Sequence, residues 1–470
     1  MKYLLLCLTI VAALSLSTPA YAGQLADQKL LEFLKKNGAL TEEQVREIKA
    51  TLDEEDKQES AKQAQKEEKQ ITAVYDDGLR FRTGDRSFDI RIGGLMQTDL
   101  MLYEPDYPVK NDFDIRRARL FISGRLYKYF NFKFEGEFEG GSTNRLVDAY
   151  ANYEYFPYMK FQIGQFKEPF SLEQLTADKN LVFMERSMGY YLTPGRDVGF
   201  MIYGNLLKDS LLYSAGVFNG DGTDATRRSQ KNDREFTGRI VALPFKHFGP
   251  SFLQGLQLGG SFSYARLDTS DFNIDIRTPA RNTFFSVKSR AKFSVLQDIE
   301  SLRRMNVEMA YAYGPVALSG EFFKNKYSKL EYSDTEPFDF YLKSWYASML
   351  CMLTGEHPTF REGILQAITP RYDFNIKERR WGAVGVGLRY EQFVGERLVY
   401  DYLIDRGYSV RRATSFTVAL NWYLNKLMRL SLNYSRTWFT DPLFYGTDPD
   451  GVSNYDDEEN AWFARFQLEF

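Results

Sequence analysis

Apolar and polar residues alternate along most of this chain, from about Leu79 to its last residue. A period of two is typical of β-strands, because successive side chains of a strand point to opposite faces of the sheet. In the first such segment, 88–103, one face carries the large apolar side chains Phe88, Ile90, Ile92, Met96, Leu100 and Leu102. The other face carries Asp89, Arg91, Gln97 and Asp99. Sixteen such segments follow one another, so the pattern predicts an all-β fold of sixteen strands.

The alternation is clearest in the segment FNFKFEGEFEG, where phenylalanines occupy one face and Asn, Lys and Glu the other. A soluble β-sandwich would bury the phenylalanines and turn the charged face to water. A membrane barrel would turn the phenylalanines to lipid and the charges to a water-filled lumen. This segment alone does not discriminate between the two folds.

The lengths of the links between the segments favour the barrel. Short links alternate with links that are mostly long: the short ones are 127–129, 156–158, 207–210, 313–315 and 425–426, and the long ones are 167–197, 219–233, 267–302, 327–339, 393–410 and 439–460. Outer-membrane barrels have short periplasmic turns and longer outer loops. Two links, 243–255 and 354–379, are long where a short one is expected. Either the strand count is displaced there, or a periplasmic link folds back into the pore.

The last segment and the link 167–197 support the same fold. Trp462, Phe466 and Phe470 lie on one face of the last segment, opposite charged residues, and the chain stops on an aromatic residue. The link 167–197 is far longer than a hairpin loop. Its Ser171 and Gln174 have the spacing of a capping box, which predicts a short helix. We therefore predict a 16-stranded antiparallel transmembrane β-barrel whose lumen is narrowed by this loop.

Four motifs, in this order along the chain, resemble those of the phosphate-selective porin O and P family of Gram-negative outer membranes: RRARLF (116–121), GQFKEPFSLEQLT…FMERS (164–187), FNGDG (218–222) and TGEHP (354–358). The resemblance covers most of residues 80–470. It implies a porin, assembled as a homotrimer, in contact with outer-membrane lipid and lipopolysaccharide. It also implies that the barrel occupies residues 76–470.

The first residues of the chain are typical of an exported protein. Residues 1–22 combine Lys2, an apolar core at 4–16 and the small-x-small cleavage site Ala20-Tyr21-Ala22, which predicts a signal peptide. Its removal would leave Cys351 as the one cysteine, so no internal disulfide is expected. No later stretch of about 18 apolar residues suggests a transmembrane helix.

Residues 23–75 are predicted to form a helical extension in the periplasm. Apolar residues recur at helical spacing as far as Leu52, and Thr41 and Gln44 have capping-box spacing. Residues 53–70 are charged and form either a helix or a linker. The apolar stripe is too short for a stable lone domain. The extension is therefore expected to self-associate as a coiled coil, as the resemblance suggests, to bind peptidoglycan or a periplasmic partner, or to act as a tether.

Composition changes this picture little. Aromatic residues make up 16% of the chain, as the two aromatic girdles of a barrel require. The net charge is −3, so any preference for anions must come from the local placement of charges. The chain has only two histidines, His247 and His357, and no HExxH, P-loop, GxSxG or Cys/His cluster. No catalytic residue, metal, cofactor or nucleic-acid partner is expected.

A lumen enclosed by sixteen strands is too wide for side chains to fill, so solutes would diffuse passively through water past charges at the narrowest part. Arg116, Arg117 and Arg119 crowd the start of the second segment. Guanidinium groups stay charged and match phosphate oxygens in pairs. These arginines are interpreted either as an anion-binding ladder or as wall structure, paired across strands with acidic residues such as Glu135, Glu137 or Asp148.

A second basic group lies in the link 267–302, which has no acidic residue between its first and last cation: Arg277, Arg281, Lys288, Arg290 and Lys292. On an extracellular loop, such a run would gather anions by raising their local concentration. It would equally suit contact with the phosphates of lipopolysaccharide.

The resemblance assigns roles to four of these positions. Arg116 and Arg117 match the arginine pair of the family's wall motif. Arg186 matches the arginine in the MER of the pore loop, and Asp148 matches an acid that faces the constriction. These matches favour the anion-binding ladder.

The chain departs from the family in the helical part of the pore loop. Phosphate-specific members carry a Lys with neighbouring Ser residues where this chain has Gln174, Ala177 and Asp178. The loss of a cation and the gain of a carboxylate weaken oxyanion binding. Lys167 and Lys179 are expected to compensate. The predicted function is passive diffusion of small anions, with phosphate or polyphosphate as leading candidates; the alternatives are a porin for other solutes, a structural envelope-tethering barrel and an outer-membrane hydrolase.

Overall fold

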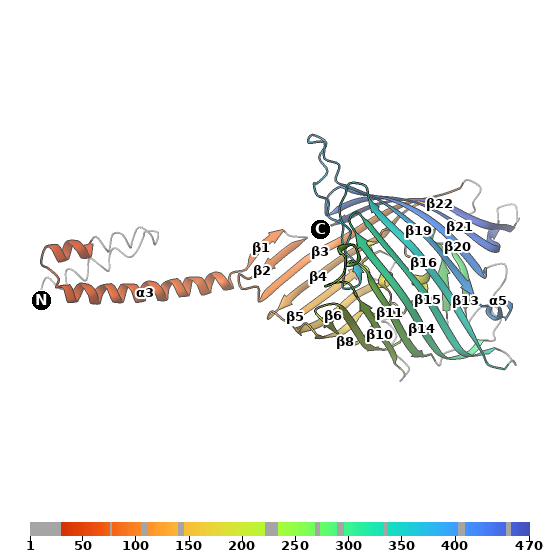
Figure 1. The fold of residues 1–470 in the computed structure, drawn as a ribbon, viewed down its shortest axis with the longest axis horizontal. Helices are drawn as coiled ribbons and strands as arrows, with labels where there is room; N and C mark the ends of the chain where they lie inside the picture. The colour runs from red at the N-terminus through yellow and green to blue at the C-terminus, as the bar shows by residue number, and fades with distance from the viewer. Residues whose placement is uncertain are drawn as a thin grey trace. The chain divides into compact units, whose positions relative to one another are not determined.

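The computed structural model describes residues 30–75, 78–104, 111–139, 145–220, 234–267, 273–288, 296–332, 336–402, 409–447 and 453–470. The expected signal peptide, 1–22, lies outside these residues. The chain divides into two compact units (Figure 1). The first contains the residues up to Thr72 together with Thr83–Asp85, and the second contains the remainder up to Phe470.

The first unit is helical. Residues 30–36 form a helix that ends at the turn of Asn37 and Gly38, and α3 runs from Glu42 to Lys69. The Thr41 backbone nitrogen donates to Gln44 Oε1 at 3.0 Å, and the Thr41 hydroxyl accepts from the Gln44 nitrogen at 3.3 Å. The capping box is therefore confirmed, and the charged segment 53–70 is a helix as far as Lys69. No described helix is both long enough and apolar enough to cross a bilayer.

The second unit is a closed antiparallel barrel of sixteen strands (Figure 1). The strands are β3 (Phe88–Tyr103), β4 (Asp112–Leu126), β5 (Phe130–Glu137), β6 (Arg145–Phe156), β7 (Met159–Lys167), β8 (Arg196–Leu206), β9 (Leu211–Phe218), β10 (Glu235–Ala242), β11 (Gln257–Arg266), β14 (Leu296–Tyr313), β15 (Val316–Tyr332), β16 (Phe338–Met352), β19 (Ala383–Gly395), β20 (Arg412–Tyr423), β21 (Met428–Thr447) and β22 (Ser453–Glu469). Each strand pairs with the next, and the last strand pairs with the first, with Arg465 opposite Asp99. The predicted fold is confirmed.

A short hairpin outside the sixteen-strand count extends the sheet. It consists of β1 (Thr72–Tyr75) and β2 (Leu79–Arg82). Strand β2 pairs with residues 89–92 of β3, and β22 pairs with residues 95–103 along the same edge. Where the two meet, Gly94 and Phe470 exchange backbone hydrogen bonds of 2.8 and 3.1 Å. The edge of β3 is therefore paired along most of its length.

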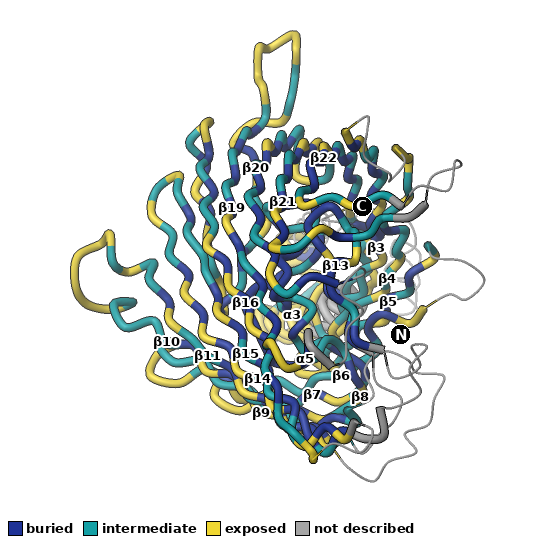
Figure 2. Tube along the Cα trace, turned by 90° about the vertical axis from the view of Figure 1, so that its right-hand side faces the viewer, coloured by how far each residue is buried: buried dark blue, intermediate teal, exposed yellow. Residues whose placement is uncertain are grey.

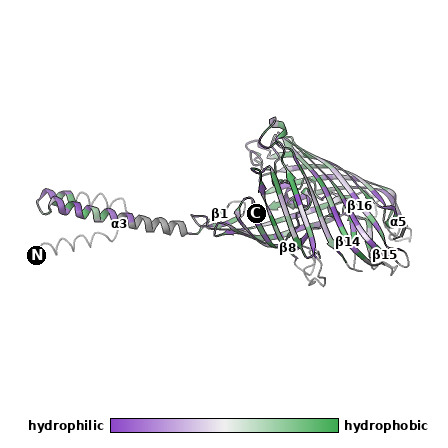
Figure 3. Ribbon diagram, turned by 60° about the horizontal axis from the view of Figure 1, so that its bottom comes forward, coloured by the Kyte–Doolittle hydropathy of each residue, from purple (hydrophilic) through white to green (hydrophobic). Residues whose placement is uncertain are grey.

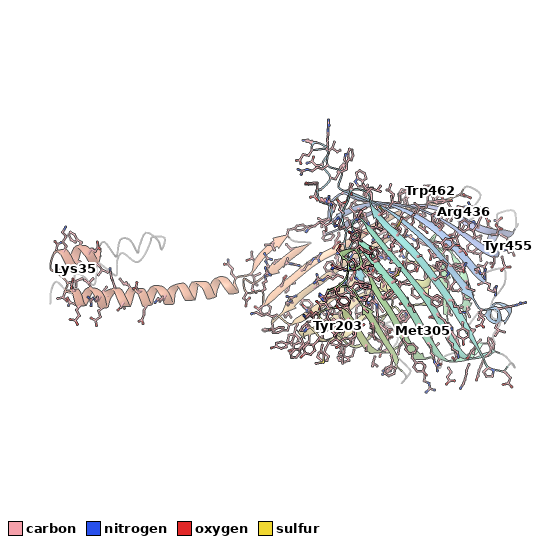
Figure 4. The ribbon with its side chains drawn as sticks, in the orientation of Figure 1. Lys35, Tyr203, Met305, Arg436, Tyr455 and Trp462 are labelled. Carbon is pink, nitrogen blue, oxygen red and sulfur yellow. The ribbon has the colours of Figure 1, made fainter. Side chains whose placement is uncertain are left out.

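The two faces of the wall have the polarity of a membrane barrel rather than of a soluble sandwich. On β5, Phe130 and Phe134 are 49% and 54% exposed, whereas Glu135 and Glu137 are only 8% exposed. Figures 2 and 3 show the same alternation of burial and hydropathy along the neighbouring strands. Large apolar side chains cover the outside, among them Met305 and Trp462 (Figure 4). A sandwich would have buried these side chains in its core.

The turns at one end of the barrel are short, as at residues 127–129, 207–210 and 314–315. The two exceptions, 243–256 and 353–382, lie at this same end, so the strand count was correct. The link 353–382 contains the hairpin of β17 (Phe360–Arg361) and β18 (Ile364–Leu365). Wall side chains bind this hairpin: Gln257 Nε2 donates to the Phe360 carbonyl at 3.1 Å, and Arg239 Nη2 to the Gly363 carbonyl at 3.0 Å. Part of this link therefore folds back into the lumen.

Candidate pore constriction

The segment between β7 and β8, residues 168–195, runs across the inside of the barrel and is called the pore loop below. It contains α4 (Leu172–Leu175) and the 3-10 turns η1 (Asp178–Asn180) and η2 (Met188–Leu192). Lumenal side chains from separate parts of the wall bind it. Asn421 Nδ2 on β20 donates to the Val182 carbonyl at 2.9 Å, and Arg429 Nη1 on β21 to the Leu181 carbonyl at 2.9 Å. The predicted narrowing of the lumen is thus built by a loop anchored on several strands.

Helix α4 is a single turn, and the wall completes its hydrogen bonds. Ser171 Oγ accepts from the Gln174 backbone nitrogen at 3.1 Å, as its spacing predicts. The carboxylate of Glu321, on β15, accepts from the backbone nitrogens of Leu172 and Glu173 at 2.8 and 2.9 Å. The first turn of a helix leaves such N–H groups without intrahelical partners. A wall carboxylate therefore fixes the start of the helix in place.

Three of the predicted arginines converge on one carboxylate of the pore loop, Asp178. Its oxygens lie 3.3 Å from Arg117 Nη2, 2.5 Å from Arg119 Nη1 and 2.5 Å from Arg186 Nη1. Arg119 also contacts Glu137 at 2.6 Å. Burial opposes ionisation of Asp178, but the arginines outweigh it and hold the pKa of Asp178 well below its ordinary value. The residue expected to weaken anion binding is thus the shared counter-ion of the arginine cluster.

A second carboxylate of the pore loop, Glu185, binds the remaining predicted wall arginine. Arg116 contacts it with both Nε (2.9 Å) and Nη2 (3.1 Å). Arg281 Nη2 at 2.9 Å and Arg465 Nη2 at 3.3 Å approach the same carboxylate. Burial opposes its charge, yet Arg116 and Arg281 keep the pKa of Glu185 well below its usual range. Arg116 keeps 32% of its side chain exposed, and its Nη1 donates no hydrogen bond to the residues that the structure describes.

Sequence reasoning missed the role of the Asp99–Arg465 pair. Both side chains of the pair are fully buried, and Arg465 Nε donates to Asp99 Oδ1 at 2.6 Å. Arg281 also binds Asp99. The alternation already placed both residues on the polar face of the first and last strands. Pairing those two strands, as a closed barrel requires, would have found the contact.

The structure places Asp148 and Lys167 beside the constriction, but each already has partners. Asp148 binds Lys133 at 2.9 Å and Arg196 at 2.8 Å. Lys167 Nζ donates to the carbonyls of Gln174 and Thr176 at 2.6 and 3.0 Å. Lys167 therefore tethers the pore loop to β7.

Lys179 binds the carboxylate of Glu469 near the end of β22, and 32% of the lysine side chain is exposed. Of the wall acids expected as partners, Glu135 and Glu137 bind Arg119, whereas Arg116 and Arg117 bind acids of the pore loop. Both interpretations of the arginines therefore have support: the side chains converge at the constriction, and carboxylates bind them there.

The basic run predicted as an extracellular loop is partly inside the barrel. The hairpin of β12 (Asn273–Arg277) and β13 (Thr283–Lys288) carries Arg281 at its turn, where it pairs with Asp99, Asp114 and Glu185. Arg281, expected on an extracellular loop, instead lies at the pore loop and binds carboxylates there. Arg277 is exposed, Lys288 ends β13, and Arg290 and Lys292 lie outside the described residues.

The other end of the pore loop has an apolar attachment. Met188 and Leu192 are fully buried in one cluster with Phe323 on β15, and the β12–β13 hairpin adds Phe284 and Phe285. Gly189 lies so close to the Phe323 ring that an added Cβ would come within 2.4 Å of it. The link 267–302 therefore contributes core as well as charge.

The histidine of the link 243–256 lies away from the pore loop. His247 is exposed in the link 243–256, where its Nε2 lies 2.7 Å from the Lys208 carbonyl. Among the residues that the structure describes, no His, Cys, Asp or Glu side chains are grouped so that they could hold a metal ion.

Comparisons with known proteins agree with this architecture. The family model "Phosphate-selective porin O and P" matches residues 90–470. Porin O of Pseudomonas aeruginosa is 26% identical over 425 residues, which is 84% of this chain and 91% of that protein. OmpT of Vibrio cholerae is 12% identical with a TM-score of 0.50 over 82% of this chain and 98% of its own. OmpF of Salmonella typhi is 11% identical with a TM-score of 0.50 over 85% and 100%. The two structures show the fold alone.

Proposed function

Because the chain belongs to the phosphate-selective porin O and P family and forms a barrel of the outer membrane, we propose that it lets small anions diffuse passively through its lumen. The observation that carries this proposal is the convergence of guanidinium groups where the pore loop meets β4 and β22. A solute crossing the lumen passes this band at its narrowest part.

Arg116 is the residue proposed to meet the anion first. Its Nε and Nη2 are held by Glu185, which fixes the guanidinium plane, while the Nη1 group has no described hydrogen-bond acceptor. Arginine has five N–H donors, so a paired guanidinium keeps capacity for a passing oxyanion. The neighbouring carboxylates make this binding weak. Weak binding suits conduction, because a tight site would trap the ion.

Phosphate or its polymers are proposed as the leading solutes, since the description of the family is that of phosphate-selective porins. The loop chemistry supports a moderate preference rather than strict selection. Asp178 stands among three arginines and competes with a phosphate for the same donors. Gln174 and Ala177 offer no positive charge in its place.

The test is the reversal potential of single channels in a salt gradient, for the wild type and for Arg116→Gln. We expect anion preference in the wild type and a shift toward non-selectivity in the variant. Arg125→Gln is the matched control: Arg125 is on the same strand but is exposed and bound to Asn131 at 3.1 Å. Cation preference in the wild type would refute the proposal. A single-channel current that does not change when phosphate is added would refute only the assignment of phosphate as the solute.

Export, assembly and the role of the N-terminal residues complete the proposal. The mature protein begins after Ala22, and residues 23–75 form a periplasmic extension. The barrel assembles as a homotrimer, like related porins, and contacts outer-membrane lipid. It is proposed not to be an enzyme, because the family is one of porins. N-terminal sequencing and native mass spectrometry of protein purified from outer membranes test the cleavage site and the trimer.

A further inference from the structure

Four basic side chains stand together on the outer face of the wall: Arg303 on β14, Lys324 and Lys326 on β15, and Lys343 on β16. We call them the outer basic cluster. Asn306, Asn325 and Ser344 are buried on the lumenal face of the same strands. The four basic residues lie an odd number of positions from them, so their side chains point outward. The strand register makes them direct neighbours. Arg303 lies opposite Lys326, and Lys324 lies opposite both Met305 and Lys343.

The cluster begins where the lipid-facing belt ends. Toward the short-turn end of the same strands, the outward-facing residues, which are every second residue, are apolar or small. They run from Met305 to Tyr313 on β14, from Val316 to Phe322 on β15, and from Trp345 to Cys351 on β16. The run on β14 has nine residues and those on β15 and β16 have seven each, close to the roughly 9 to 11 residues that carry a tilted strand across a bilayer. The cluster lies at the end of the strands that carries the longer links, which is the outer end. The cations therefore sit at the level of the outer-leaflet headgroups.

The charge balance of this surface differs from that of the lumen. Like charges directly opposite each other destabilise a sheet, and the cluster contains two such pairs. The acids next to it lie on the loop side: Asp339 binds Lys326 at 2.6 Å, and Glu300 binds Lys329 at 2.6 Å. Of the carboxylates that the structure describes, none forms an ion pair with Arg303, Lys324 or Lys343. The arginines that bind Asp178 and Glu185 at the pore constriction, by contrast, are each paired with a carboxylate.

Aromatic rings hold the cations in position. Lys324 Nζ lies 4.8 Å from the centre of the Tyr341 ring, and the Arg303 guanidinium lies 5.8 Å from that of Tyr264. Amphipathic rings at this depth are typical of a membrane interface. Such rings stabilise the cations while leaving their N–H donors free for an anion. The outer face of the wall therefore presents positive charge at its outer end and an apolar surface next to it, at the level of the bilayer core.

We propose that the outer basic cluster binds the phosphate groups of lipopolysaccharide, with the acyl chains lying along the apolar belt beneath. The site faces away from the lumen, so a phosphate passing through the pore does not reach it. Acyl chains supply apolar contacts that inorganic phosphate lacks. The ligand is therefore a phosphorylated lipid of the outer leaflet rather than the transported solute.

The test measures binding of purified lipid A to the full-length protein in detergent, by native mass spectrometry at graded lipid concentration. The double variant Lys324→Gln with Lys343→Gln should bind bisphosphorylated lipid A about tenfold or more weakly, since each cation near a charged membrane surface contributes appreciably to attraction. Lys324→Arg with Lys343→Arg should bind like the wild type. Lys128→Gln with Lys208→Gln, which removes two exposed cations from the short-turn end, is the matched control and should bind normally.

Two further measurements identify the ligand. Lipid A without phosphates should bind the wild type as weakly as bisphosphorylated lipid A binds the double glutamine variant. Millimolar inorganic phosphate should not displace the lipid. Equal binding by the glutamine variant and the wild type would overturn the proposal, as would displacement by inorganic phosphate. Single-channel conductance of the variants should equal that of the wild type, which separates this test from that of the proposed function.

Discussion

The pore loop is attached to the barrel in two different ways, and the difference separates geometry from electrostatics. At one end, Asp178 and Glu185 bind arginines of β4 and β22. At the other end, Met188 and Leu192 pack among phenylalanines of β15 and of the β12–β13 hairpin. The polar attachment is directional and lies at the constriction. The apolar attachment is mainly non-directional packing, to which the carboxyl of Glu391 adds one hydrogen bond from the Met188 backbone nitrogen at 2.6 Å.

This contrast predicts different consequences for the two ends. Weakening the apolar attachment should loosen the loop while the charges at the constriction stay the same. Weakening the polar attachment should change both the position of the loop and the charge that an ion meets. Substitutions at the polar attachment should therefore change both ion selectivity and stability, whereas substitutions at the apolar attachment should change stability alone.

The largest effect is expected from Asp178→Asn. The substitution removes the common counter-ion of Arg117, Arg119 and Arg186, which leaves buried guanidinium groups under-compensated. Breaking a buried ion pair by removing one partner costs about 3–5 kcal/mol. Urea titration in lipid vesicles should show a loss of this size in the free energy of unfolding, and single channels should become more anion-selective. Unchanged selectivity would show that these arginines do not face the ion path.

Phe323→Ala should cost nearly as much stability without changing selectivity. Phe323 is fully buried against Gly189 and the loop residues around it. Large-to-small changes of a buried Phe cost about 3–5 kcal/mol, toward the lower end where neighbours can close the cavity. The unfolding free energy and the open-channel noise should change, whereas the reversal potential should stay at the wild-type value. A shifted reversal potential would mean that the apolar end also positions the charges.

Acid should weaken the polar attachment alone. The pKa of Asp178 is held well below its ordinary value of 3.8 when the protein is folded. The stabilisation is therefore fully present above the unfolded pKa and is lost as the pH falls through the folded pKa. The difference in unfolding free energy between wild type and Asp178→Asn should be constant above about pH 5 and should narrow below about pH 4. For Phe323→Ala, the corresponding difference should not vary with pH.

The alternation of the strands predicted the barrel well, because period, link length and strand number are all local properties of the sequence. The same pattern placed Asp99 and Arg465 on the lumenal face. It did not pair them, since the two residues meet only when the last strand closes onto the first. The sequence grouped Arg116, Arg117 and Arg119 on one strand, and the resemblance placed Arg186 in the pore loop, but the convergence of Arg117, Arg119 and Arg186 on one carboxylate was not predicted. Their shared partner, Asp178, was interpreted, from its departure from the family's pore-loop motif, as a residue that weakens anion binding rather than as the counter-ion of the cluster.

The links were harder to predict than the strands. The run from Arg277 to Lys288 has an acid-free sequence, which suggests a solvated loop. Its hairpin also contains Phe284 and Phe285, and these side chains are fully buried in the cluster around Met188. Burial of two adjacent phenylalanines draws the hairpin inward and brings Arg281 to Glu185. A charge count along a link misses this effect, because the apolar residues decide on which side of the wall the link packs.

The smallest effect is expected from Lys179→Gln. This substitution removes a partly exposed ion pair, which differs from both the buried ion pairs and the apolar packing that attach the pore loop. Lys179 also belongs to the pore loop and also binds a carboxylate, Glu469, but about a third of its side chain is exposed. Exposed ion pairs contribute about 0–1 kcal/mol, because water and salt screen them and both side chains lose rotamer freedom. In the variant, Glu469 would still have Arg91 as an ion-pair partner at 3.4 Å, so its negative charge would not be unpaired. The unfolding free energy should therefore fall by less than about 1 kcal/mol, and raising the salt concentration should abolish the difference. A loss as large as that of Asp178→Asn would show that position along the loop, rather than burial of the pair, determines how strongly a contact holds it.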